Sequence, residues 1–216
     1  MQPIVVTVGP LAGASANAIA LSQTPTTGSL TLNGALVVAG VAVMDKPRQV
    51  LITATADETS KTFVITGTDW ARSPISESVT GVNNSTVASK LNYATVTSIT
   101  ISANAASALT VGTNGVASSP WIRLDGWANP SVTKQCTVSG TVNYTIQTSM
   151  DDPNAATSPV APSAMTWAND PDLGFVAATT TMSGGVIFAP LWIRALLNSG
   201  SGSVTFSIQQ TGNAPY

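Results

Sequence analysis

The chain has 216 residues and a formal net charge of -2 at pH 7, and only 8% of its residues are charged. Binding to nucleic acid depends on clustered Lys and Arg, so this balance argues against a nucleic-acid partner. There is no histidine and a single cysteine, Cys136. The composition therefore lacks the commonest general base and metal ligand, and it excludes an internal disulfide.

The first residues and the apolar runs of the sequence favour a soluble protein made in a cytoplasm. Residues 1–4 lack the basic start and the apolar core of a signal peptide. The longest apolar run, 35–44, is about half of the 20 residues needed to cross a bilayer. We therefore expect synthesis in a cytoplasm and no membrane partner.

The first half of the chain consists of short β-branched segments between turn residues. Segment 11–21 is rich in Ala and Ser and fits a short helix or a loop. Segment 36–43 fits a strand buried on both faces or a contact with another subunit. Turn signals about every 8 to 12 residues are typical of a sandwich or a barrel. We expect strands at 3–8, 29–33, 50–55, 62–67, 75–80, 93–103 and 109–112.

Residues 113–120 have the composition of a linker and mark the expected domain boundary. The expected N-terminal β domain spans 1–118, and its first 34 residues, with weak internal patterning, are a candidate docking arm. The expected C-terminal β-sandwich domain spans 119–216. Within it, 151–171 is rich in Pro, Ala and Ser and predicts a long loop with one helical turn at 164–168.

The second half contains a weak internal repeat. Segment 139–147 begins with Ser-Gly and alternates apolar and polar residues, and 201–209 repeats this pattern. Such alternation predicts strands with one buried face. A short link precedes the second copy, which favours an antiparallel hairpin. Its expected pairs are Leu197 with Val204, Ala195 with Phe206, and Ile193 with Ile208.

Together these patterns predict an all-β fold of two units in tandem, each an antiparallel β-sandwich or jelly-roll-like arrangement with little helix. No stretch shows the 3.6-residue apolar stripe of a sizeable helix. Because charge is scarce, the surface must be rich in hydroxyl and amide groups. Edge strands on such a surface are an aggregation hazard unless neighbouring molecules cover them.

Several phrases in the sequence resemble a group of tailed-bacteriophage virion proteins. They lie at 47–53, 63–69, 95–99, 111–116, 144–147 with 151–154, and 202–209. The resemblance implies a non-enzymatic accessory protein of the virion, made in the host cytoplasm, as head decoration or cement, or as a neck or tail fibre-like appendage. Its implied partners are copies of itself, as a homo-oligomer, and other virion proteins such as capsid, portal or adaptor, or tail components.

Four acidic residues bracket the long loop, namely Asp151, Asp152, Asp170 and Asp172. They could gather around Ca²⁺ or form a glycosidase pair, but their spacing matches no Ca²⁺ loop, and Asp beside Pro and Asn is ordinary turn chemistry. Cys136 has no histidine to activate it and is expected to be a half-buried strand thiol. We therefore predict no catalytic residue, no metal site and no cofactor, with a hydrolase as the most distant hypothesis.

Tryptophan supplies the candidate contact residues. Trp121 and Trp192 lie in expected strands and are best explained as half-buried, with an arginine stacked nearby. Tryptophan and arginine are favoured as interface anchors, and the candidate protein-contact residues are Trp70, Arg72, Trp127 and Trp167. The alternative function is a carbohydrate-binding or receptor-binding β module that uses the same aromatic side chains, so a glycan partner stays possible.

Overall fold

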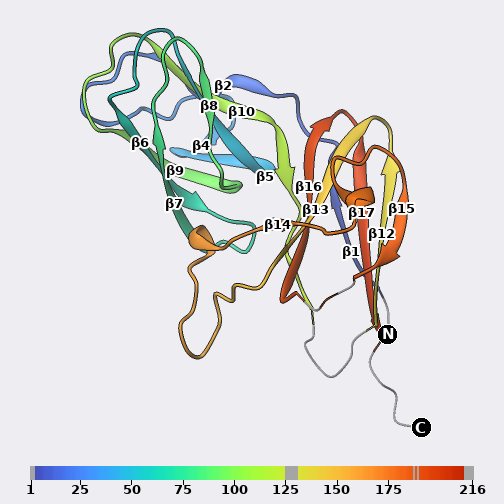
Figure 1. Cartoon of the computed structure of the whole chain (residues 1–216). Coiled ribbons are helices and arrows are strands. Elements are labelled where there is room, and N and C mark those ends of the chain that lie inside the picture. Colours follow the sequence, from blue (N-terminus) through green and yellow to red (C-terminus); the bar gives the residue numbers. More distant parts are fainter. Residues whose placement is uncertain (1–2, 125–130, 187, 189, 212–216) are drawn as a thin grey trace. The chain divides into compact units, whose positions relative to one another are not determined.

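The computed structural model describes residues 3–124, 131–186, 188 and 190–211. The chain forms two compact units (Figure 1). We call residues 12–115 the central unit, and residues 1–11 together with 116–216 the terminal unit. In the described part of the chain, helix is limited to two short 3-10 segments, η1 (Pro162–Ala164) and η2 (Leu173–Phe175). The predicted all-β class is confirmed.

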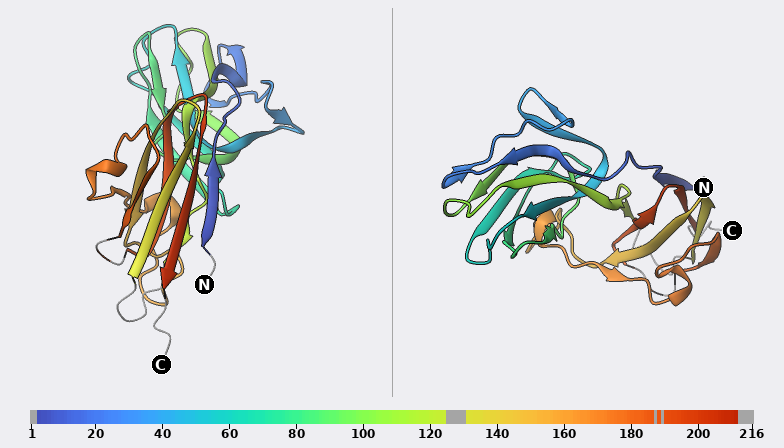
Figure 2. Two further views of the ribbon diagram at one scale, coloured as in Figure 1. Left: turned by 90° about the vertical axis from the view of Figure 1, so that its right-hand side faces the viewer. Right: turned by 90° about the horizontal axis from the view of Figure 1, so that it is seen from above.

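The terminal unit is a sandwich of two antiparallel sheets. The first sheet has the order β1 (Ile4–Val8), β17 (Ser203–Thr211), β12 (Ser131–Ser139) and β15 (Met182–Gly185). The second has the order β14 (Ala168–Asn169), β13 (Val142–Ser149) and β16 (Trp192–Gly200), and β16 also pairs with β11 (Ile122–Arg123) and with the end of β10 (Leu109–Ser118). Figure 2 shows the two layers from the side and from above.

The core of this sandwich contains the apolar positions of the internal repeat. Tyr144 and Ile146 of β13 are fully buried, as are Phe206 and Val204 of β17. The alternation therefore identified the buried face correctly. The predicted hairpin is nevertheless wrong, because β16 pairs with β13 and β17 pairs with β12.

Each Ser-Gly connection carries the chain from one sheet of the sandwich to the other. The first joins β12 to β13, and the second joins β16 to β17. In this arrangement Ala195 and Phe206 face the same core from opposite sheets. Alternation fixes the face of a strand but not the sheet it joins, so a hairpin and an inter-sheet connection look the same in the sequence.

Residues 1–11 belong to the terminal unit, and the chain enters the central unit at residue 12. Strand β1 pairs with β17 along its whole length, from Ile4 opposite Ile208 to Val8 opposite Val204. Val8 is fully buried in the sandwich core. The division of the chain thus differs from the expected one at 1–11, because an apolar face on β1 completes the terminal sandwich.

Strand β10 replaces the expected linker. Residues 113–118 continue the strand that begins at Leu109, and Ala117 and Ser118 pair with β16. Ala117 is fully buried in the core of the terminal unit. The small polar residues and glycine of 113–118 have the composition of a linker, but here their backbones are hydrogen-bonded within the sheet.

The central unit is built around β5 (Val41–Ala54), which changes partners along its length. Near Ala42 it pairs with β4 (Val37–Val38) and β9 (Tyr93–Ile101), and near Ile52 it pairs with β8 (Thr86–Ala88). The sheet continues from β9 to β6 (Thr62–Thr68) and β7 (Pro74–Thr80), with β3 (Gly28–Ser29) on β9. On the other side of β5 lies β10, which pairs with β2 (Ser15–Gln23).

These strands enclose the second core, whose fully buried members include Ile19, Val50, Phe63, Ile65 and Ile99. Segment 11–21, for which a helix or a loop was expected, contains most of β2. Its Ala-rich pattern gave no alternation because Ala18, Ile19 and Ala20 are buried in succession.

Candidate interaction surfaces

The four acidic residues around the long loop do not gather. Asp151 accepts a hydrogen bond from the amide of Thr166, and Asp152 accepts one from the amide of Asn154. Asp172 caps η2 by accepting from the amide of Gly174 at 3.0 Å. Asp170 is paired with Lys134 in the core. Across the described residues no group of three potential metal ligands occurs.

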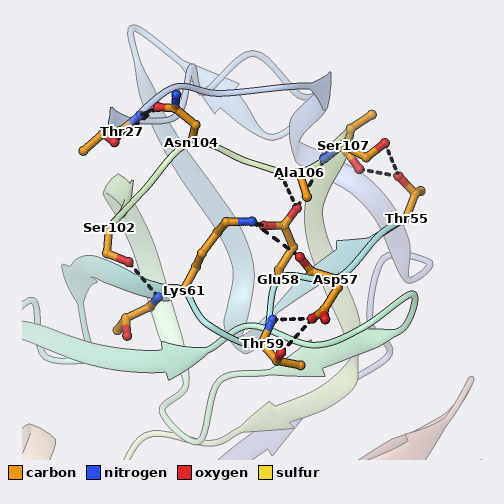
Figure 3. Close-up of polar contacts among 12 residues, drawn as sticks. Thr27, Thr55, Asp57, Glu58, Thr59, Lys61, Ser102, Asn104, Ala106 and Ser107 are labelled. Carbon is orange, nitrogen blue, oxygen red and sulfur yellow. Dashed lines mark hydrogen bonds and ion pairs between the residues drawn. The ribbon is translucent and has the colours of Figure 1, made fainter.

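A buried carboxylate organises one end of the central unit (Figure 3). Glu58 is fully buried. Its Oε1 accepts from the amide of Ala106 at 2.8 Å, and its Oε2 accepts from Nζ of Lys61 at 2.5 Å. Glu58 thereby joins the turn between β5 and β6 to the segment before β10. Its oxygens are engaged by the lysine and by main chain, so the arrangement fixes loops and presents no free base.

Asp57 extends the same cluster toward the surface. Its Oδ1 accepts from both the amide and the hydroxyl of Thr59, at 2.9 and 2.7 Å. These hydrogen bonds lower the pKa of Asp57 because they favour the ionised carboxylate. This is a turn motif typical of Asp, and it closes the β5–β6 connection.

Trp167 lies in a cluster of aromatic and arginine side chains in the terminal unit. The centroid of its ring is 4.0 Å from the guanidinium carbon of Arg194. The ring centroids of Trp167 and Trp121 are 5.1 Å apart. The ring centroids of Trp192 and Trp121 are 6.3 Å apart. The guanidinium carbon of Arg123 lies over the Trp192 ring, 5.9 Å from its centroid. The expected stacking of arginine on a strand tryptophan is thus present at Trp192.

Arg194 holds this cluster to the sheet. Its Nε and Nη2 both donate to Oε1 of Gln147, at 3.1 and 2.8 Å. Arg194 and Trp192 are buried, and Trp167 is half-buried. One face of the Trp167 ring is therefore occupied by Arg194 within its own unit, which leaves less of this ring for an outside partner.

Trp70 and Arg72 lie in the tight connection between β6 and β7. The carboxylate of Asp69 accepts from the amides of Ala71 and Ser73, at 2.8 and 2.9 Å. Burial raises the pKa of Asp69. Trp70 is half-buried, whereas Arg72 is exposed and adopts a φ of 66°. Trp127, the remaining candidate, lies outside the described residues.

The most distinctive surface feature is the uncharged segment, by which we mean residues 1–44. It contains no Asp, Glu, Lys or Arg. Among the described residues, eight large hydrophobic side chains are exposed, and five of them belong to this segment, namely Ile4, Val5, Leu21, Val38 and Val43. Single exposed apolar residues are ordinary, but their concentration in a segment without charges is typical of a contact surface.

Within the uncharged segment, β4 and the start of β5 form an apolar hairpin. Val38 pairs with Val41 across a two-residue turn, Ala39-Gly40, in which both residues have positive φ. Such a turn matches the twist of the flanking strands. Val38 is 68% exposed at the tip. The expected strand buried on both faces is therefore wrong, because 36–43 forms a hairpin whose tip is exposed while Ala42 is buried. Contact of this segment with another subunit stays a prediction.

The uncharged segment also supplies an edge strand. Among the strands that the structure describes, β1 is the outermost of its sheet and has β17 as its neighbour. Ile4 and Val5 on it are exposed. An edge strand with exposed apolar side chains and no charge can add a further strand from another chain.

A shallow apolar pocket of about 200 Å³ lies in the terminal unit, with Met150 and Phe188 among its lining residues. Sites for drug-sized ligands are usually ~300 Å³ or larger. Its single acidic residue, Asp151, is engaged with the amide of Thr166. The pocket therefore offers little polar recognition.

The chain matches no protein-family model, no curated protein and no solved structure. In the described residues no helix is long and apolar enough to span a membrane.

Proposed function

We propose that this chain is a non-enzymatic structural protein of a bacteriophage particle, acting through contacts with copies of itself and with other particle proteins. Its place would be on the head as decoration or cement, or at the neck or tail as a fibre-like appendage. The bacteriophage part of the proposal is supported by the sequence resemblance alone. The contact part is supported by the uncharged segment and its exposed apolar side chains.

The exposed valines of the apolar hairpin allow the free energy of the expected self-association to be estimated. Complete burial of a valine side chain contributes ~1.5–3 kcal/mol, and Val38 and Val43 are 68% and 48% exposed. In a two-fold contact each residue is counted twice, so the hairpin supplies roughly 4 to 7 kcal/mol before the cost of association. A micromolar dissociation constant needs ~8 kcal/mol net. We therefore expect the isolated protein to associate weakly and stable packing to need further surfaces.

Sedimentation velocity across a range of protein concentrations tests the contact part. The wild type should sediment faster as concentration rises, and V38K should remove much of this dependence by placing a charge at the hairpin tip. L173K is the matched control, because Leu173 is 80% exposed but lies outside the uncharged segment. A wild type that stays monomeric at every concentration would contradict the proposed self-contact.

The particle itself tests the rest of the proposal. Particles purified from lysed host cells should contain the protein at a fixed copy number, resistant to washing with high salt. Salt screens incidental ionic contacts, whereas apolar contacts persist and are strengthened by salts such as sulfate. Loss of the protein from the particles on repeated purification would contradict a structural role.

A further inference from the structure

Lys134 occupies a core position of the terminal sandwich. On β12, Val132 and Cys136 point into the core, and Lys134 lies between them on the same face. Its side chain is 1% exposed. Its neighbours in register are Ile208 on β17 and Gly184 on β15. A lysine is rarely buried this completely.

Asp170 reaches the lysine from the other sheet. It follows β14, and its amide donates to the carbonyl of Ile146 at 2.9 Å, which fixes its backbone beside β13. Its side chain is 2% exposed. The carboxylate Oδ1 accepts from the amide of Asp172 at 2.9 Å, and Oδ2 is in contact with Nζ of Lys134.

Uncharged side chains lie against this pair. The ring centroid of Phe175 is 4.1 Å from the lysine Nζ. Cys136 lies next to the pair and Tyr144 next to Cys136, and burial raises the pKa of both, that of Cys136 to about 12. Both groups therefore stay protonated at neutral pH. Two opposite charges in such an enclosure carry a large desolvation cost, which favours a neutral product.

We propose that Lys134 and Asp170 condense into an intramolecular amide bond that links the two sheets of the terminal sandwich. The ammonium first transfers a proton to Oδ2, which gives an uncharged amine and an uncharged carboxylic acid. The amine nitrogen then attacks Cγ, and a bond forms between Nζ and Cγ. A second proton passes from Nζ to Oδ2 as the bond between Cγ and Oδ2 breaks, and one water leaves.

The geometry around Asp170 assigns distinct roles to its two oxygens. Oδ1, held by the amide of Asp172, becomes the carbonyl oxygen of the product. That amide is placed to stabilise the negative charge that develops on Oδ1 during attack. Oδ2, which contacts the lysine, is the oxygen that leaves. The buried lysine has the desolvated environment that makes an amine nucleophilic. This inference is independent of the proposed function.

Another buried pair in the described part of the chain, Lys61 with Glu58, differs from the Lys134 pair in two respects. The Lys61 side chain is 10% exposed, and its Nζ also donates to the carbonyl of Asp57 at 3.4 Å. Contact with solvent and with a second acceptor stabilises the ammonium form, so we expect this pair to remain ionic. It serves as an internal control in the same molecule.

Mass spectrometry of the purified wild-type protein tests the proposal. The intact mass should fall below that of the sequence by one water, about 18 Da. Trypsin cleaves after lysine and arginine, and an acylated Lys134 resists it. The unfolded, digested protein should therefore yield a single peptide spanning 124–194 that lacks one water. Recovery of 124–134 and 135–194 as unmodified linear peptides would overturn the proposal.

Two variants show which residues are joined. K134R keeps the positive charge but has no amine that can condense, so it should show the full sequence mass. K61R should lose one water as the wild type does, because the proposed bond does not involve Lys61. A loss of water that persists in K134R would place the modification elsewhere and would equally overturn the proposal.

Discussion

Gly140 and Gly202 lie against each other where the two inter-sheet connections of the terminal unit meet. A Cβ atom on Gly140 would lie 3.1 Å from Cα of Gly202, and one on Gly202 would lie 2.2 Å from the carbonyl oxygen of Ser139. The amide of Gly202 also donates to the carbonyl of Thr141 at 2.9 Å. The two Ser-Gly repeats therefore brace each other through main chain, and side chains are excluded between them.

We predict that G202A destabilises the protein by ~2 kcal/mol or more, because the added methyl group overlaps main chain that cannot move without breaking the connection. Urea unfolding followed by circular dichroism measures the effect. G13A is the matched control, since a Cβ on Gly13 meets open space. Its stability should stay within about 0.5 kcal/mol of the wild type or rise slightly. Equal stability of the two variants would contradict the close contact.

The sequence was sufficient to predict the fold class and the buried faces, because alternation of apolar and polar residues reports directly on burial. It was insufficient for topology. Strands β16 and β17 are adjacent in sequence and separated by a short link, yet they join opposite sheets. The arrangement brings Gly140 and Gly202 together, and no local pattern encodes a contact between residues 62 positions apart.

The candidate surfaces were only partly predictable. The expected docking arm covered most of the uncharged segment, but β1 and β2 are paired into sheets and do not extend freely. The expected arm left out residues 35–44 of this segment. The absence of charged residues before Asp45 was a signal in the sequence that could have included them. Lys134 was another: it breaks the apolar alternation of β12, and a charge at a core position demands a partner. The identity of that partner, Asp170, could be found only from the folded chain.

The buried pair at Glu58 gives a second test of stability. We expect E58Q to lower the free energy of unfolding by ~3 kcal/mol, because it leaves the Lys61 ammonium without a carboxylate in a buried site. Guanidinium unfolding measures the loss. The control is R123Q, which breaks the pair between Arg123 and Asp152. The Arg123 side chain is 55% exposed, so solvent screens this pair and the expected cost is ~0–1 kcal/mol. Comparable losses in both variants would contradict the role assigned to Glu58.

The burial of Cys136 predicts that the folded protein loses stability at alkaline pH. Burial raises the pKa of its thiol from 9.0 to about 12 in the folded chain. The unfolded chain can ionise near pH 9 whereas the folded chain holds the proton, so this contribution is fully present below about pH 9 and is lost as pH rises toward 12. By about pH 11 the loss should reach about 2–3 kcal/mol.

Urea midpoints measured at about pH 8 and about pH 11 check this expectation, with C136A as the control. The variant should lose stability at both values through the smaller side chain, but its decline with pH should be shallower than that of the wild type. Some decline must remain, because burial also raises the pKa of Tyr93 and Tyr144. Identical slopes in the two proteins would contradict a buried, protonated thiol.

The contact between Trp167 and Arg194 predicts a measurable coupling energy. With the guanidinium carbon 4.0 Å from the ring centroid and Arg194 buried, the interaction should lie at the upper end of cation–π energies, ~1–2 kcal/mol. A double-mutant cycle of W167A and R194A, followed by urea unfolding, isolates this energy from the lost area of each side chain. A second cycle of W167A with R123A should give a smaller value, because Arg123 stacks on Trp192. Equal coupling in the two cycles would show that Trp167 acts through general packing of the cluster and not through its contact with Arg194.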